Sequence, residues 1–317
     1  MTRTPATDHR SPRSTTSASL LVLLSAACFG TIPIFTVLAA RAGASLATTL
    51  AWRYLLAGAV FVIAARSRER LRLPPGRLRE VILLGGVGQA MLGGLALSAL
   101  AFIPAATMVF LFYTYPAWVT LLAALRRTEP LTGTRVAALL LSLGGIVAMV
   151  GAPSAASLDP RGVGLALAAA VLYALYIPLL NRLQQGASPY ALSVPTVVTA
   201  GLIFVIAGAV APALFGGFTV HLSLGAWASV TGLAVLSTAL AFILFLTALP
   251  TLGPVRAAII STLEPFVAAL LQRLVLGQPL GAGTFAGGVL IASAVLLLQL
   301  RGAADAAAAS VAGERPV

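Results

Sequence analysis

Two stretches of the sequence decide the fold. Residues 115–131 read YPAWVTLLAALRRTEPL, and residues 264–280 read EPFVAALLQRLVLGQPL. Each contains a proline, twelve further residues, an acid or its amide, and then Pro-Leu, so that Pro116 aligns with Pro265. Chance matches are common in a chain rich in Leu, Ala and Gly, but this joined match covers the end of one apolar run and the start of the next. It indicates an internal repeat.

The composition around these stretches is typical of a membrane protein. Of 317 residues, 59% are hydrophobic and 9% are charged, with a mean hydropathy of +1.01. Soluble domains carry about 25% charged residues, so a soluble globular fold is excluded. The net charge of +12 comes from arginines in short connectors rather than from a basic face interleaved with aromatics, which argues against nucleic acid as a partner.

The same inventory limits the chemistry. Cys28 is the single cysteine, so an internal disulfide is excluded, and no CxxC or His/Cys cluster suggests a metal. No GxxxxGK[ST] phosphate loop is present, which gives no support to an ATP-driven pump. We therefore expect no metal and no cofactor.

The apolar runs predict an all-α membrane protein with ten transmembrane helices. The runs are about 15 to 25 residues long, the length that crosses a ~30 Å hydrocarbon layer. Only helices suit such spans, because a lipid-exposed backbone must satisfy its own hydrogen bonds. The ten expected spans are 19–40, 46–65, 81–102, 106–125, 136–150, 162–180, 190–211, 225–249, 255–276 and 283–300.

The arginines indicate on which side of the membrane each connector lies. If the N-terminus is cytoplasmic, sixteen of the twenty arginines fall inside, whereas Arg41, Arg161 and Arg273 fall outside and Arg53 stays within a span. The positive-inside rule then places both termini in the cytoplasm. We expect a multi-pass protein of the cytoplasmic (cell) membrane.

The repeat divides the chain into two halves, 19–151 and 161–300, of five spans each. Because five is odd, the second half crosses the membrane in the opposite sense to the first. Two inverted five-helix repeats are the architecture of many alternating-access carriers, with the site near the midplane between the repeats. The tails, 1–18 and 301–317, are polar or low in complexity, so we expect disordered cytoplasmic tails.

A family resemblance joins these observations. Residues 99–151 and 260–298 resemble the ends of two tandem EamA domains of the drug/metabolite transporter superfamily, and the most specific piece is STLEP at 261–265, followed by GQPL at 277–280. Gln278 stands where the second copy usually has Glu, at a helix end, where it weakens a cap. The resemblance implies a ten-helix exporter or importer of small metabolites, often amino-acid-like or drug-like compounds.

Charged residues inside spans are the first candidates for the site. A charge costs about 2.5 to 3.5 kcal/mol at a helix centre, and Arg53 and Glu264 are the two that stand out. Glu264 either binds a substrate ammonium or a proton, or is a structural acid that fixes helix packing; Ser261 shares its helix face. Arg53 either holds a substrate carboxylate through its planar fork or pairs structurally with Glu264 or with backbone carbonyls.

Prolines within spans form a second group. Pro116, Pro265, Pro33 and Pro178 each deprive a carbonyl four residues earlier of its helical partner, so they predict helix breaks. Freed carbonyls are tolerated at depth only against protein or a water-lined cavity. The paired Pro116 and Pro265 therefore point toward a translocation route, and the alternative is a kink that only improves packing.

Buried tyrosines and an amide complete the candidate set. Tyr113 and Tyr115 lie just before Pro116, Tyr176 lies in the sixth span and Gln89 interrupts the third. These side chains either recognise substrate or bond across helices. Tyr113 and Tyr115 point about 160° apart on a helix, so at most one of them faces a given cavity.

Together these features predict a secondary transporter rather than an enzyme. We expect export of a small organic metabolite, with protons as a further partner if transport is coupled through Glu264. Gly283 and Gly287 leave open a monomer or a weak homodimer. The alternatives are a membrane-integral lipid-modifying enzyme or a non-transporting membrane sensor. The enzyme would need several acids, histidines or cysteines within reach of one another, and Glu264 is the one acid well inside a span.

Overall fold

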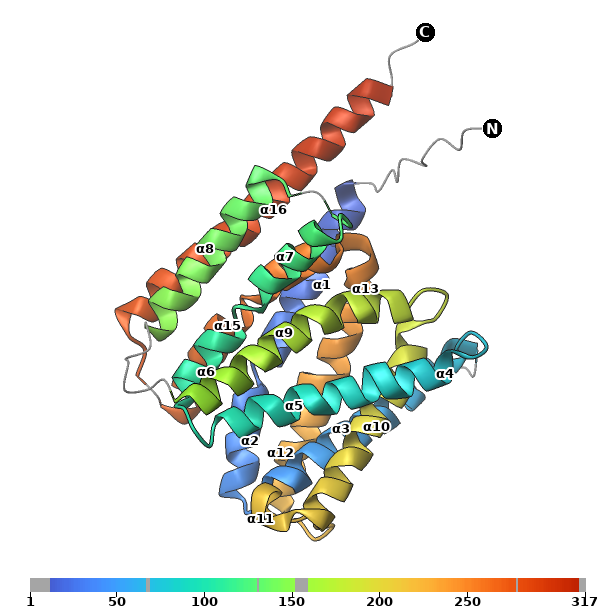
Figure 1. Cartoon of the computed structure of the whole chain (residues 1–317), viewed down its shortest axis with the longest axis vertical. Coiled ribbons are helices and arrows are strands. Elements are labelled where there is room, and N and C mark those ends of the chain that lie inside the picture. Colours follow the sequence, from blue (N-terminus) through green and yellow to red (C-terminus); the bar gives the residue numbers. More distant parts are fainter. Residues whose placement is uncertain (1–11, 67–68, 130, 152–158, 278, 314–317) are drawn as a thin grey trace.

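Helices make up every regular element that the structure describes (Figure 1). The computed structural model describes residues 12–66, 69–129, 131–151, 159–277 and 279–313. Within these ranges nine helical segments are long and apolar enough to cross a membrane, and a shorter apolar one, Ala282–Leu298, follows them. The chain is an all-helical, multi-pass membrane protein, and each of these segments overlaps one of the ten expected spans.

The first half supplies five spans. The first span is built of two helices, the second of one, the third of two helices and a π-helical segment, the fourth of two and the fifth of one. In chain order the elements are α1 (Pro12–Phe29), α2 (Ile32–Arg41), α3 (Leu46–Ala65), η1 (Glu69–Leu71), α4 (Arg77–Glu80), η2 (Val81–Val87), α5 (Gly88–Ala99), α6 (Ala105–Phe112), α7 (Tyr115–Leu125) and α8 (Gly133–Val150).

The second half follows the same order with fewer breaks. Its sixth and seventh candidate spans and the shorter apolar segment at the end of the half are single helices. The eighth candidate span again contains a π-helical segment, and the ninth is again divided. The elements are α9 (Pro160–Leu183), α10 (Pro189–Val210), α11 (Pro212–Phe215), α12 (Leu224–Ala234), η4 (Val235–Leu240), α13 (Ala241–Leu252), α14 (Pro254–Ser261), α15 (Glu264–Leu276) and α16 (Ala282–Gly313).

Polar caps mark where several of these helices begin. The hydroxyls of Ser45, Ser188 and Ser223 each accept a hydrogen bond from the backbone N–H three residues later, at 3.1, 3.1 and 3.2 Å. The carboxylate of Asp159 accepts from the Arg161 N–H at 2.8 Å. Such side chains satisfy the free N–H groups of a first helical turn, so the sequence fixes these helix starts locally.

Three spans are interrupted, and a threonine lies at each interruption. The hydroxyls of Thr31, Thr114 and Thr262 each donate to the carbonyl three residues earlier, at 2.6 Å in all three cases. A proline follows each threonine at the second position of the next helix, where its missing N–H costs nothing. These prolines are Pro33, Pro116 and Pro265.

The expected break at Pro178 is absent. Pro178 lies inside helix α9, which is continuous from Pro160 to Leu183. The residues before it, Leu175, Tyr176 and Ile177, include neither a glycine nor a threonine. One lost hydrogen bond interrupts a helix only where the local sequence also favours a turn, and here it does not.

The last helices of the two halves, α8 and α16, lie side by side (Figure 1). A Cβ added at Gly145 would lie 2.8 Å from the Gly287 carbonyl oxygen, and one at Gly283 would collide with the Ala148 carbonyl. Backbone meets backbone along this seam, which joins the halves through small residues. Gly283 and Gly287 of α16 therefore pack within the chain.

Helices extend into both of the stretches that we expected to be disordered tails. Helix α1 already begins at Pro12 and α16 continues to Gly313, and both of these ends lie on the same side of the molecule (Figure 1). The stretch after Arg301 is rich in alanine, the best helix former. Its low complexity led us to expect disorder, but the same composition also favours a helix. Residues 1–11 and 314–317 lie outside the described residues.

Candidate functional site

A cavity of about 310 Å³ lies between the two halves. Its walls come from the first four spans of the first half and from the first four spans of the second half, and most of its lining is apolar. Helices α8 and α16 contribute none of the described lining residues. The cavity is within the size range of small-molecule sites.

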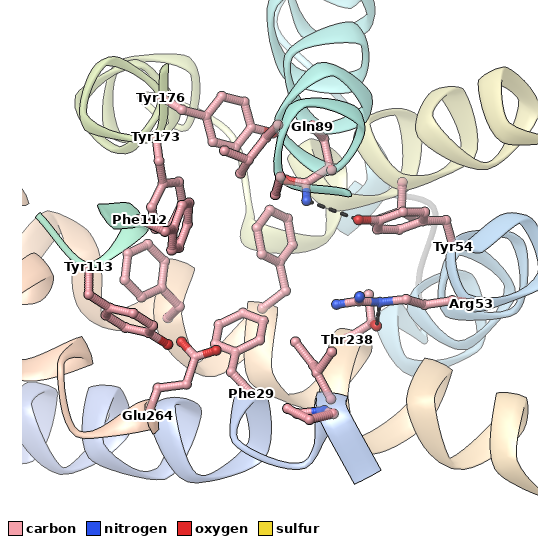
Figure 2. A pocket seen from close by; sticks show the side chains of 18 of the residues that line it. Phe29, Arg53, Tyr54, Gln89, Phe112, Tyr113, Tyr173, Tyr176, Thr238 and Glu264 are labelled. Carbon is pink, nitrogen blue, oxygen red and sulfur yellow. Dashed lines mark hydrogen bonds between the residues drawn. The ribbon is translucent and has the colours of Figure 1, made fainter. Parts of the chain in front are cut away.

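Arg53 reaches the cavity from α3. Its side chain is 9% exposed, its Nε donates to the Thr238 hydroxyl at 2.8 Å, and its guanidinium lies 5.1 Å from the centre of the Tyr54 ring. Figure 2 shows the terminal nitrogens of Arg53 pointing into the cavity. A buried cation is thus held at its inner nitrogen and lies over an aromatic ring.

Glu264 faces Arg53 across the cavity (Figure 2). It is the first residue of α15, directly after the break in the ninth span, and the Tyr113 hydroxyl points at its carboxylate. Gly30, at the break in the first span, packs on this same turn: a Cβ there would lie 3.1 Å from the Glu264 carbonyl oxygen. Among the described residues no ion pair joins Glu264 to Arg53.

Aromatic rings and one amide line the wall between the two charges (Figure 2). Tyr173 stacks on Phe112 with ring centroids 5.5 Å apart. Gln89 donates from its Nε2 to the Tyr54 hydroxyl at 3.2 Å, and the Tyr176 hydroxyl donates to the Gly85 carbonyl at 2.8 Å. The hydrogen bonds hold these side chains in place while their apolar faces border the cavity.

The structure brings six of the sequence candidates together in this cavity and leaves the others behind its wall. Arg53, Tyr113, Gln89, Tyr176, Glu264 and Pro33 line it. Tyr115 is buried and donates its hydroxyl to the Ala258 carbonyl at 3.3 Å, and Ser261 donates to the Ala257 carbonyl at 2.9 Å. Pro116 and Pro265 are buried beside the breaks, and Pro178 borders a different cavity.

Comparison with known proteins identifies the family. The model of the EamA-like transporter family matches residues 16–151 and again residues 160–300. The chain belongs to this family. It is a membrane transporter of small solutes, and the two EamA matches coincide with the halves separated above.

One solved structure shares the fold of this EamA-like transporter. It carries the description "Crystal structure of protein" and superimposes with a TM-score of 0.74 at 21% sequence identity, covering 90% of this chain and 98% of the other. No curated protein matches the chain in sequence. The structural likeness supports the fold of the EamA halves.

Sequence reasoning missed Tyr54 and Thr238, both of which line the cavity. Tyr54 follows Arg53 directly, and its neighbourhood to an intramembrane charge was the available signal. Thr238 is one of many hydroxyl residues in apolar runs, and no local pattern distinguishes it. Its partner Arg53 is far away in the sequence, so only the fold brings the two together.

A second cavity, of about 490 Å³, lies beside the connector between the fourth and fifth spans. There the Glu129 carboxylate forms an ion pair with Arg135 at 3.0 Å and accepts from the Val255 N–H at 3.3 Å. Val255 belongs to the first turn of α14, so Glu129 links the first EamA half to the second. Gln278, its counterpart in the repeat, lies outside the described residues.

Proposed function

We propose that the chain is a secondary transporter that exports a small organic metabolite, amino-acid-like or drug-like, by alternating access. The observation that carries this proposal is a cavity between the two EamA halves with one cation and one anion on facing walls, Arg53 and Glu264. Transport by this route requires that both halves contact the solute, and eight of the ten spans border the cavity.

The membrane arrangement is part of the proposal. We assign the halves as two inverted five-helix repeats in the cytoplasmic (cell) membrane, with both termini in the cytoplasm, because sixteen of the twenty arginines then lie inside. Nine candidate spans and the shorter helix Ala282–Leu298, five segments in each half of the described chain, support the inversion. The second cavity, beside Glu129, then lies at the cytoplasmic end of the route.

Glu264 is the proposed coupling residue. An ionised carboxylate within a span is expensive unless a cation or a proton compensates it. The described residues provide a neighbouring hydroxyl, from Tyr113, but no ion-pair partner. A substrate ammonium and a proton are the two ligands that satisfy this chemistry, and exchanging one for the other would couple their movements.

Flux measurements test the proposal. Proteoliposomes with the purified full chain are loaded with an extract of small metabolites, and the efflux of each compound is followed by mass spectrometry. We expect a narrow set of compounds to leave faster than from protein-free vesicles. Equal efflux with and without protein for every compound would contradict transport and favour a sensor or an enzyme.

Glu264→Gln tests the coupling role, with Glu80→Gln as the matched control because Glu80 is exposed in α4, outside the cavity. We expect Glu264→Gln to abolish substrate-driven proton movement and Glu80→Gln to leave it unchanged. If Glu264→Gln moves protons as the wild type does, Glu264 is not the coupling residue.

A further inference from the structure

The guanidinium of Arg53 is anchored on one side only. It carries five N–H donors, and the donor on Nε is used by Thr238. The other four, on the two terminal nitrogens, make no hydrogen bond to any residue in the described ranges. These nitrogens point into the cavity (Figure 2), so the free end of a buried cation is aimed at the space where a solute would bind.

Thr238 has its own orientation fixed. Its hydroxyl donates to the Leu233 carbonyl at 2.9 Å, five residues earlier, and its side chain is 4% exposed. A hydroxyl has a single proton. Because Thr238 donates that proton to the Leu233 carbonyl, its oxygen is left to accept the hydrogen bond from Arg53. The long reach is possible because Thr238 lies in η4, the π-helical segment of the eighth span.

The π-helical segment therefore determines which edge of Arg53 is available. With Nε bound to Thr238 and the guanidinium carbon over the Tyr54 ring, the edge formed by the two terminal nitrogens remains. Two parallel N–H donors at this edge match the two oxygens of a carboxylate.

We propose that Thr238 is a positioning residue that presents the end-on edge of Arg53 to the carboxylate of a small, largely apolar solute. This inference rests on the proposed function and narrows its substrate class to carboxylates. The cavity volume of about 310 Å³ and its aromatic walls set the size and character of the rest of the molecule. Glu264 lies on the facing wall, and no ion pair joins it to Arg53 among the described residues.

Matched probes test the substrate class without any knowledge of the natural solute. Benzoate and benzamide have nearly the same shape and differ in the carboxylate. We expect the purified full chain to bind benzoate at least about tenfold more tightly than benzamide by calorimetry, the range for a hydrogen bond to a charged group. Binding of benzamide as tight as that of benzoate, or no binding of either, would overturn the carboxylate assignment. Tighter binding of benzenesulfonate than of benzoate would overturn it as well.

Three threonine variants test the positioning role. Thr238→Val removes the hydroxyl at nearly constant shape, and we expect the ratio of benzamide to benzoate dissociation constants to fall to about one, whereas Thr238→Ser restores it. Thr49→Val is the control, because Thr49 lies in the same helix as Arg53 and its hydroxyl donates to its own helix, to the Ser45 carbonyl at 2.8 Å. A wild-type ratio in Thr238→Val, or an equal loss in Thr49→Val, would overturn the positioning role.

The binding ratio tests the positioning role of Thr238, and the flux tests the transport proposal, so a failure of one can be told from a failure of the other. If Thr238→Val keeps the wild-type ratio while proteoliposomes still export metabolites, the inference fails and the transport proposal stands. If no metabolite is exported by the wild type, the transport proposal fails whatever the ratio is.

Discussion

The fourth and ninth spans have the same backbone break and different chemistry. Each is interrupted after a threonine whose hydroxyl donates to the carbonyl three residues earlier, and each resumes next to a proline. The first residue of the new helix is Tyr115 in one half and Glu264 in the other. Tyr115 is buried behind the wall, whereas Glu264 borders the cavity. The repeat thus preserves the break and places a carboxylate at one copy only.

The largest effect is expected when Glu264, the first residue after the break in the ninth span, is replaced by tyrosine, the residue at the equivalent position of the fourth span. Glu264→Tyr removes the anion from the cavity wall and adds a ring that the 310 Å³ cavity has to accommodate. We expect solute flux to fall to the level of protein-free vesicles, while Tyr115→Phe keeps flux within about twofold because it loses a single hydrogen bond away from the cavity. Equal losses in both variants would mean that the two breaks do not differ in function.

A second prediction compares two adjacent glycines in α8. A Cβ at Gly145 would lie 2.7 Å from Ile291 and 2.8 Å from the Gly287 carbonyl, whereas a Cβ at Gly144 meets nothing within 4 Å. We expect Gly145→Ala to lower the free energy of unfolding by about 1–3 kcal/mol and Gly144→Ala to raise it by about 0.5–1 kcal/mol. Denaturant titration in detergent measures both, and a matching sign for the two would contradict a tight seam.

Removing the hydroxyls at the breaks should have a smaller effect. Thr262→Val deletes one side chain to backbone hydrogen bond, worth about 1 kcal/mol. Thr114→Val deletes the corresponding bond and also the one that the Thr114 hydroxyl accepts from the Trp118 Nε1 at 3.2 Å. We expect a somewhat larger loss of unfolding free energy in Thr114→Val, but a larger loss of flux in Thr262→Val, because Glu264 follows that break and has to keep its place. If flux falls equally in the two variants, the two breaks contribute to transport only through the backbone geometry that they share, and the position of Glu264 does not distinguish them.

The smallest effect is expected when Glu129 in the first half is replaced by glutamine, the residue at the equivalent position of the second half. Glu129→Gln weakens the half-buried ion pair with Arg135, whose two side chains are 14% and 16% exposed, and keeps an oxygen for the Val255 N–H. We expect a loss of at most about 1 kcal/mol in unfolding free energy. The salt dependence of stability should decrease in the variant, and an unchanged salt dependence would argue that the ion pair does not contribute.

Much of this fold follows from local sequence, and much of the site does not. Apolar length predicted the overlapping helical segments, and proline spacing gave positions where Thr31, Thr114 and Thr262 precede a break. Pro178 shows the limit, because a proline alone did not interrupt α9. The alanines after Arg301 show another, because composition typical of disorder is also typical of helix.

The sequence predicted residues of the candidate site only where placing the side chain inside a membrane span costs free energy. Arg53 and Glu264 could be singled out because a charge in a span carries a cost whatever its surroundings. Tyr113 and Tyr115 could be separated only by the helical angle between them, and the sequence did not say which one faces the cavity. Thr238 carries no such cost, so its bond to Arg53 became visible only in three dimensions.

The seam between α8 and α16 has a mechanical consequence. These helices end the two halves, lie outside the cavity and touch through backbone at Gly145, Gly283 and Gly287. Interdigitated side chains prevent two helices from sliding past each other. Glycines at the contact allow one helix to rotate against the other while their backbones stay in contact. In the alternating-access mechanism that we propose, the two halves rotate about this line of contact, so a larger side chain there should slow transport without contacting the solute.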